Sequence, residues 1–302
     1  MTEKLSSPPS ALALYPRAVA PLIPGASRLP WVAGRGTAVP ERELVLEDVR
    51  ADPGQLARYA RVCGYRLGAT LPPTYPHVLA FGLHMALMTR GDFPFAPVGL
   101  VHVENVITQR RAIKTGATLE LRARATQPEP HPKGRTFAFL TEARVDGDLV
   151  WEERSTMLRR GGDGSDDHHR PSRTKPPELP ARAQWTLPGD LGRRYAAASG
   201  DRNPIHLSGL TAKLFGFPDA IAHGMWTKAR CLAALEGRLP AAFRAEVAFR
   251  QPIRLPGQVT WASEERGSGI RFAVRGAKRA ASATGTPHLD GTVTSLKRKA
   301  SA

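Results

Sequence analysis

The sequence predicts an α+β fold in which an antiparallel sheet curls around a long buried helix, and it predicts that this unit occurs twice. Three observations support this prediction. Residues 77–88, HVLAFGLHMALM, are almost wholly apolar, which is typical of a helix buried on most of its circumference. Several segments with the pattern of β-strands follow that helix in a row, as an antiparallel meander requires. A string near residue 58 also recurs near residue 194, which indicates a duplication.

The chain is long enough for two domains, because its 302 residues exceed the usual size of one hydrophobic core. Apolar residues make up 41% and charged residues 23%, a globular balance that excludes an intrinsically disordered protein. Only two cysteines occur, so a disulfide framework cannot stabilise the chain, and we expect a reducing, cytoplasmic location. The apolar run at residues 11–15 is too short and too interrupted by prolines for a signal segment or a membrane span.

The formal net charge of +16 indicates a positive surface field. Such a field favours polyanionic partners, and the charge alone does not choose among nucleic acid, anionic lipid and a phosphate-bearing ligand. The basic residues Lys297, Arg298 and Lys299 near the C-terminus are most simply explained as a frayed tail, and we do not expect nucleic-acid contact there.

The first elements are indicated by composition and capping signals. Residues 1–40 are rich in proline, alanine and serine, so we expect a loosely packed arm that carries no chemistry. Residues 42–50 then alternate apolar and polar side chains, as a half-buried strand does. Asp52 is placed to cap a short helix over residues 53–62, and an irregular passage with three prolines leads to the buried helix.

Four β-rich segments complete the first half, at residues 99–106, 118–126, 135–144 and 149–158. Gly, Pro and charged residues then dominate a stretch with little capacity to form a core, which indicates a linker. The predicted organisation is therefore an arm (1–40), a first half (41–160), a linker (161–184) and a second half (185–302). The linker contains Asp166, Asp167, His168 and His169, which we interpret as solvated chain rather than as a metal site.

The internal repeat is directly visible in the sequence. RYARVCGY at residues 58–65 matches RYAAASGD at residues 194–201, and LAFGL at 79–83 matches IAHGM at 221–225. By these matches the two glycines of the first copy lie 18 positions apart and those of the second copy 24, so the second copy holds six extra residues. Those residues surround DRNPIH, whereas the first copy has Tyr65 where Asp201 stands. We therefore expect only the second half to carry chemistry.

Two proton-carrying side chains, Asp201 and His206, stand beside a proline turn. Asn203 precedes Pro204 and is thereby pushed out of the helical region, so the two side chains can converge on one water and act in general acid and base catalysis. Downstream, Gly224 stands where a helix should begin, and its free N–H could bind an oxyanion. Two simpler interpretations remain open: the string forms only a turn capped by Asp201, and His223 is a core or capping histidine.

The string YAAASGDRNPIHLSGLTAKLFGFPDAIAHGM resembles the motif of the MaoC-like, R-specific enoyl-thioester hydratase and dehydratase family. LPPTYPHVLAF and FPFAPVGLVHVENVITQRR further resemble the double hot dog (3R)-hydroxyacyl-thioester dehydratases of actinobacterial type. The resemblance covers about residues 40–295 and implies a double hot dog fold, with residues 41–160 forming a degenerate half that shapes the acyl-chain tunnel.

The same resemblance implies roles for individual residues. Asp201 and His206 would hold the catalytic water, and Gly224 would donate its N–H to the thioester carbonyl. The residues that would shape the motif loop are Ser199, Gly200, Asn203, Pro204 and His223. The implied reaction needs no metal and no redox cofactor. Its substrate would be an acyl thioester of coenzyme A or of acyl carrier protein, and the protein would be a monomeric pseudo-dimer or a homodimer.

Two other functions stay open at the level of the sequence. Hot dog proteins also include acyl-thioesterases, which would release a free thiol and leave the conjugated double bond intact. A non-catalytic acyl-thioester-binding or nucleic-acid-binding protein is favoured by charge alone, and the Asp201 and His206 pair argues against it.

Overall fold

The computed structural model describes residues 1–23, 25, 29, 31–34, 36–161, 179–267, 269–276 and 285–296. The acidic and histidine cluster at residues 166–169 and the basic residues 297–299 lie outside the described residues. No helix in the described ranges is both long and apolar enough to cross a membrane.

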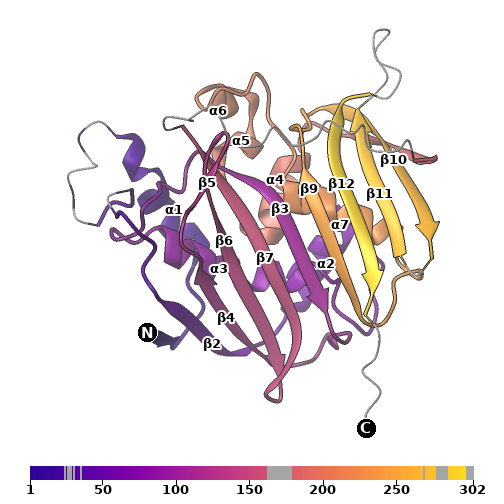
Figure 1. The fold of residues 1–302 in the computed structure, drawn as a ribbon, viewed down its shortest axis with the longest axis horizontal. Helices are drawn as coiled ribbons and strands as arrows, with labels where there is room; N and C mark the ends of the chain where they lie inside the picture. The colour runs from indigo at the N-terminus through magenta and orange to yellow at the C-terminus, as the bar shows by residue number, and fades with distance from the viewer. Residues whose placement is uncertain are drawn as a thin grey trace.

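One continuous sheet runs through both halves of the chain, and its strands cross the front of Figure 1 with the main helices behind them. The strands of the first half are β1 (Thr2–Leu5), β2 (Glu43–Val49), β3 (Leu100–Gln109), β4 (Leu119–Ala125), β5 (Glu129–His131), β6 (Gly134–Val145) and β7 (Asp148–Arg160). Those of the second half are β8 (Ala181–Leu187), β9 (Phe243–Phe249), β10 (Gly257–Arg266), β11 (Gly269–Gly276) and β12 (Pro287–Ser295).

The helices are α1 (Ala11–Val19), α2 (Pro53–Cys63), α3 (Tyr75–Met88), α4 (Leu191–Ser199), α5 (Pro204–Leu207), α6 (Gly209–Lys213) and α7 (Gly224–Ala234), with a short 3₁₀ helix at Ala20–Leu22. The strand order is β1-β2-β4-β6-β7-β3-β9-β12-β11-β10-β8, with β5 paired to β6. The two halves therefore meet where β3 pairs antiparallel with β9, from Glu104 opposite Ala248 to Gln109 opposite Phe243.

The predicted elements of the first half are confirmed. The meander and the buried helix form where their patterns indicated, and α3 buries nine of its residues against the sheet. Asp52 caps α2 as expected, because its Oδ1 accepts a hydrogen bond from the Gln55 N–H at 2.7 Å. A sheet that wraps a central helix in each half is the predicted α+β arrangement (Figure 1).

Of the two sequence matches, the one between residues 58–65 and 194–201 joins equivalent positions in the structure, and the one between residues 79–83 and 221–225 does not. Gly64 and Gly200 both end a helix in the left-handed region, with φ of 81° and 82°, as their matched strings predict. Gly82, however, lies in the middle of α3, whereas Gly224 begins α7. The starts of α3 and α7 lie 11 positions after Gly64 and 24 positions after Gly200, respectively, so the second half holds 13 extra residues and not six. An apolar helix offers no unique register for matching, which explains the error.

Two expectations about irregular chain need correction. The arm of residues 1–40 contains β1, which pairs in parallel with β2, and α1, whose N-terminus is capped by Ser10. Ala11, Leu14, Tyr15 and Ala18 form an apolar stripe at helical spacing that packs on the core. The predicted linker also ends earlier than residue 184, because Ala181 begins β8, which pairs with β10.

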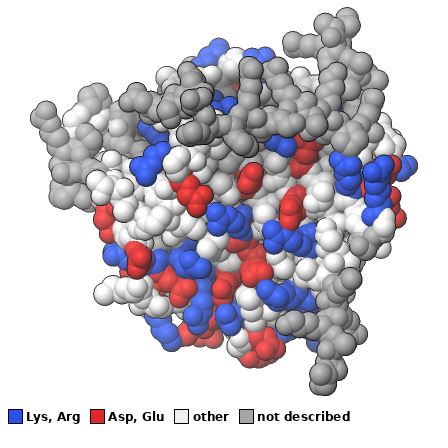
Figure 2. All heavy atoms as spheres, in the orientation of Figure 1, with Lys and Arg blue, Asp and Glu red and all other residues white. Residues whose placement is uncertain are grey.

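The outer face of the sheet is a solvated surface of mixed charge. Figure 2 shows Lys and Arg side chains interleaved with Asp and Glu over the strands that face the viewer. Asp290 on β12, for example, accepts hydrogen bonds from Arg250 and Arg275. Paired charges of this kind keep the face in water, which leaves the opposite, helix-covered side for the core and the site.

Candidate active site

A short loop after α4 fixes the position of Asp201. Ser199 donates its hydroxyl to the Tyr195 carbonyl at 2.9 Å, and the same hydroxyl accepts the Asp201 N–H at 3.2 Å. Gly200 takes the left-handed conformation that turns the chain out of the helix. The Asp201 carboxylate therefore projects from a turn that is braced at both ends.

The proline turn positions His206. Pro204 is the first residue of α5, and the side-chain oxygen of Asn203 caps this turn by accepting the Ile205 N–H at 3.4 Å. The turn packs directly on α4 at Gly192, where an added Cβ would lie 1.9 Å from the His206 carbonyl oxygen. Only glycine permits this approach, so α4 and α5 hold the two proton-carrying side chains at a fixed separation.

The His206 ring has a defined tautomer. Its Nδ1 lies 2.7 Å from the Ile221 carbonyl oxygen, which can only accept, so Nδ1 carries the proton and Nε2 is left as the acceptor. Among the described residues, Nε2 has no hydrogen-bond partner. Burial lowers the pKa of His206 below its ordinary value in spite of the nearby Asp201 carboxylate, so the ring is neutral at neutral pH.

His223 lies between the other two groups and braces them. Its Nε2 donates to the Asp201 main-chain carbonyl at 3.0 Å and lies 3.8 Å from Asp201 Oδ2. Its ring stacks on His206 with the centroids 3.7 Å apart, and it contacts the ring of Tyr195 at 4.7 Å. Burial and the neighbouring His206 lower the pKa of His223 to about 3, so this ring stays neutral. These contacts tie His223 to the Asp201 backbone, to His206 and to Tyr195.

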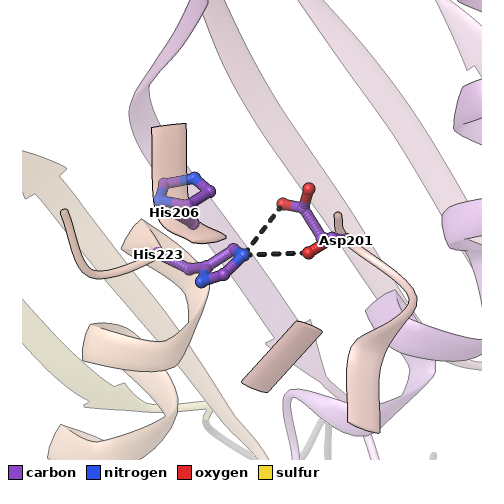
Figure 3. A group of neighbouring side chains, drawn as sticks. All are labelled: Asp201, His206 and His223. Atoms are coloured by element: carbon purple, nitrogen blue, oxygen red, sulfur yellow. Dashed lines mark hydrogen bonds and ion pairs between the residues drawn. The ribbon is translucent and has the colours of Figure 1, made fainter. Parts of the chain in front are cut away.

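The three side chains converge, as Figure 3 shows, with His223 beneath His206 and both beside Asp201. One ligand atom from each lies within 4.8 Å of the others. Two acceptors that share one water, each at about 2.8 Å, lie about 4 to 5 Å apart, so Asp201 and His206 can hold a water between them. A divalent ion would have to use His223 through Nδ1, because Nε2 donates its hydrogen to the Asp201 carbonyl.

The Asp201 carboxylate is ionised at neutral pH. Its burial opposes ionisation, but the His223 and His206 rings, the Asn203 N–H and the Tyr15 hydroxyl outweigh that effect and lower its pKa. The side chain keeps 30% of its surface exposed, whereas that of His223 keeps 2%. The carboxylate is therefore partly accessible to solvent.

Gly224 leaves its main-chain N–H without an acceptor inside its own helix. It is the first residue of α7, and the preceding His223 provides no side-chain cap. The first intrahelical hydrogen bond runs from the Thr227 N–H to the His223 carbonyl at 3.1 Å, so the Gly224 N–H has no acceptor within the helix. A Cβ on Gly224 would lie 3.2 Å from the Phe249 ring, so the start of α7 packs closely on β9.

The sequence interpretation missed one residue that contacts Asp201 and one buried lysine on the helix that begins at Gly224. Tyr15, on α1, donates its hydroxyl to Asp201 Oδ1 at 3.2 Å. Lys228, one turn after Gly224, is fully buried and donates its Nζ hydrogens to Asn105 on β3 and to the Ala245 carbonyl on β9. A lysine inside an apolar helix is a signal that could have been followed, whereas nothing local marks Tyr15.

Comparison with known proteins identifies the family. A family model for the MaoC-like domain matches residues 174–285, the range that holds Asp201, His206 and Gly224. The 3-hydroxyacyl-thioester dehydratase X of Mycobacterium tuberculosis is 38% identical over 290 residues, which cover 95% of this chain and 99% of that protein. The chain belongs to the MaoC-like dehydratase family.

Solved structures confirm the fold of this MaoC-like protein. The crystal structure of that M. tuberculosis dehydratase, HtdX, aligns with a TM-score of 0.73 and covers 84% of this chain and 100% of its own. A MaoC-like dehydratase from Phytophthora capsici shares 20% identity with a TM-score of 0.66 and covers 85% of this chain and 96% of its own. An M. tuberculosis protein described as a double hot dog shares 15% identity with a TM-score of 0.51 and covers 86% and 96%. The last two matches concern the fold alone, and the predicted double hot dog is confirmed.

Proposed function

We propose that the protein catalyses the reversible hydration of trans-2-enoyl thioesters, and equally the dehydration of (3R)-hydroxyacyl thioesters, on a water held by Asp201 and His206. It is an enzyme, a hydro-lyase of the MaoC-like family. The observation that carries the proposal is the convergence of an ionised carboxylate and a neutral imidazole beside the open N-terminus of α7.

The pair can move the protons that the reaction requires. In the hydration direction the water oxygen bonds to C3 while the C2–C3 π bond breaks and C2 gains a hydrogen. The Asp201 and His206 pair takes one proton from the water and returns one proton to C2, so it ends in the state in which it began. Because both groups lie on one side of the substrate, oxygen and hydrogen add to the same face, which is syn addition.

The Gly224 N–H would meet the charge that develops on the thioester oxygen. As the carbon–carbon bond reacts, the thioester carbonyl gains enolate character, and an N–H at a helix start stabilises such an oxyanion. Removal of one preorganised donor of this kind costs about 3 to 4 kcal/mol of transition-state stabilisation in comparable sites. The partial exposure of Gly224, between the buried His223 and Met225, supports this role.

The two halves divide the work in this proposal. Residues 185–302 carry the acid, the base and the oxyanion donor, while residues 41–160 shape the acyl-chain tunnel. Phe81 on α3 supports this division, because its ring lies 3.7 Å from the position that a Cβ on Gly200 would take, next to Asp201. Since β3 and β9 already join the halves within one chain, the smallest working unit is a monomeric pseudo-dimer, which could pair again as a homodimer.

The carrier of the acyl group is coenzyme A or acyl carrier protein. The net charge of +16 supports both, because phosphates and an acidic carrier are steered by a positive field. We place the enzyme in the cytoplasm, in fatty acid metabolism, where the buried free thiols Cys63 and Cys231 stay reduced. No metal ion takes part in the proposed steps, so a chelator should leave the rate unchanged.

The test is hydration of a short and a long trans-2-enoyl thioester, on coenzyme A and on acyl carrier protein, followed by loss of the enoyl absorbance. We expect turnover of at least one substrate, with the (3R)-hydroxyacyl thioester as product. Thioester hydrolysis also lowers this absorbance, so the products are identified and free thiol is titrated. Release of free thiol together with an acid that keeps its carbon–carbon double bond would make the protein a thioesterase. If the protein binds these thioesters but turns over none of them, a non-catalytic binding protein is the better account.

A further inference from the structure

The N-terminal arm reaches the catalytic carboxylate. Tyr15 lies on α1, outside the two hot dog halves, yet its hydroxyl donates to Asp201 Oδ1 at 3.2 Å. The same hydroxyl oxygen accepts the main-chain N–H of Arg202. One phenol group from the arm thus contacts both the carboxylate and the backbone of the motif loop.

Glycines within α3 and at the end of α4 allow the arm to pack closely against these helices. An added Cβ on Gly82 of α3 would lie 2.3 Å from the Pro9 carbonyl oxygen, so the chain entering α1 packs on a bare helix surface. A Cβ on Gly200 would lie 3.9 Å from Ala11, at the first turn of α1. The stripe that includes Ala11 and Tyr15 packs on the hydrophobic core, as Figure 1 reflects in the placement of α1 beside α3.

The contact determines which carboxylate oxygen is available. Asp201 Oδ1 accepts the Tyr15 hydroxyl and the Asn203 N–H, the latter at 3.1 Å. Oδ2 is left on the side of His223, 3.8 Å from its Nε2. Two donors on one oxygen fix the rotation of the carboxylate, so only Oδ2 can turn toward a water shared with His206.

The Tyr15 hydroxyl is suited to hold this position at every working pH. Burial and the Asp201 carboxylate raise the pKa of Tyr15 far above its ordinary value, so the phenol remains protonated and remains a donor. A group with such a pKa does not exchange protons with the substrate near neutral pH. Its part is therefore to orient and stabilise the ionised form of Asp201.

We propose that Tyr15 is a positioning residue of the active site, and that α1 is a built part of that site which sets Asp201 Oδ2 toward the catalytic water. The proposal rests on the function proposed above. It goes beyond that function because it assigns a role to the arm, which lies outside both hot dog halves.

The first test compares Tyr15→Phe with the parent. The ring and its packing remain, and only the hydroxyl is lost. A hydrogen bond to a charged group corresponds to roughly a 10- to 100-fold change, so kcat should fall about 10-fold or more while KM changes little. Because the hydroxyl lowers the pKa of Asp201, its loss should move the acid limb of the pH–rate profile to higher pH. Tyr65→Phe is the matched control, since its hydroxyl contacts only Thr74 among the described side chains, and it should keep the parent kcat.

The groups around Asp201 define what the pH profile reports. His206 faces Asp201 from α5, His223 from the start of α7, Tyr15 from α1 and Tyr195 from α4. Tyr195 and Tyr15 both have raised pKa values, so they stay protonated and do not set the acid limb. Asp201, His206 and His223 all have lowered pKa values, so the acid limb reports the three coupled groups together. An upward shift in Tyr15→Phe is assigned to the carboxylate, because Asp201 is the member of this group that accepts the Tyr15 hydroxyl.

A second variant displaces the arm without altering any group of the site. Gly82→Ala favours the helical state of α3 but places a methyl group against the Pro9 carbonyl, so α1 should be pushed off. This variant should reproduce the kcat loss and the pH shift of Tyr15→Phe, and the double variant should lose little more than either single one. Parent-like kcat and an unshifted profile in Tyr15→Phe would overturn the proposal while leaving the proposed reaction intact. Absence of turnover by the parent would instead count against the reaction.

Discussion

The segments that follow α2 and α4 begin with the same backbone turn but place different side chains after it. In the first half that side chain packs in the core, and in the second half we propose that it takes part in the reaction. Both helices end at a left-handed glycine, Gly64 or Gly200. In the first half the next residue is Tyr65, 8% exposed, and its hydroxyl contacts Thr74 within a group of packed tyrosine rings. In the second half it is Asp201, with 30% of its side chain exposed beside two histidines. The same turn is thus followed by a buried side chain in the first half and by a partly exposed one in the second.

The extra chain of the second half explains the difference. The 11 positions from Gly64 to Tyr75 lead straight into α3, whereas the 24 positions from Gly200 to Gly224 make room for α5 and α6. That insertion brings in His206 and sets it against α4. The two core helices also begin differently. α7 begins at Gly224, whose N–H has no acceptor within the helix, whereas α3 begins at the buried Tyr75. In the proposed function, the repeated half supplies the scaffold and the longer segment of the second half supplies the site.

The largest expected effect is on the helix start that distinguishes the halves. Gly224→Pro removes the proposed oxyanion donor, yet proline is well tolerated at the first helical position, and His223 already has an extended backbone with ψ of 139°. We expect kcat to fall about 10²- to 10³-fold.

Gly224→Ala is the matched control for that variant. It introduces the same Cβ contact with Phe249 but keeps the N–H, so the effect of that contact is measured apart from the changes that proline makes at the nitrogen. Alanine should retain much more activity than proline. If both variants lose activity equally, contact with Phe249 and not the donor is responsible, and the role of Gly224 is lost.

A smaller effect, on the pH dependence of stability, is expected at the contact between Lys228 of the second half and β3 of the first half. Lys228 on α7 is fully buried and contacts Asn105 on β3 of the other half, and burial lowers its pKa to about 7. Because this folded-state pKa lies below the unfolded value, the folded protein binds fewer protons, and stability rises with pH from about 7 to about 10.5. Lys228→Met lacks this proton linkage. The free energy of unfolding of the parent minus that of the variant should therefore increase as pH rises, by a few kcal/mol at most.

Urea unfolding of both proteins at pH 7, 8, 9 and 10 measures this effect. The buried histidines His84, His102 and His223 titrate near 3, far below the pH range of the measurement, so they do not contribute to the difference. A difference between the two proteins that stays constant with pH would mean that Lys228 is not buried as a titrating group.

Much of the site could be predicted because its parts are local in sequence. Ser199, Asp201, Asn203 and His206 share one loop and one short helix, so turn chemistry places them together without knowledge of the rest of the fold. The meander and both core helices were predictable for the same reason, since their patterns are periodic within a few residues.

What could not be predicted depends on contacts between distant segments. Tyr15 and Asp201 lie 186 positions apart, and a proline- and alanine-rich arm gives no sign that one of its side chains enters a site. The register of α3 against α7 was also mispredicted, because apolar residues around Gly82 and Gly224 match equally well in several alignments. The alignment of α3 with α7 is decided by where each helix begins. Capping residues and contacts with the sheet set those positions, and the apolar composition does not.

The most direct test of the account is a double-mutant cycle on the proposed water-holding pair. Asp201→Asn and His206→Ala should each lower kcat/KM for the enoyl thioester by at least about 10²-fold, with the fold retained by circular dichroism. Because both groups act on one water, the double variant should lose little more than the more damaging single variant. Full additivity of the two losses, or an Asp201→Asn variant with parent activity, would contradict the claim that the pair works as a unit in the second half.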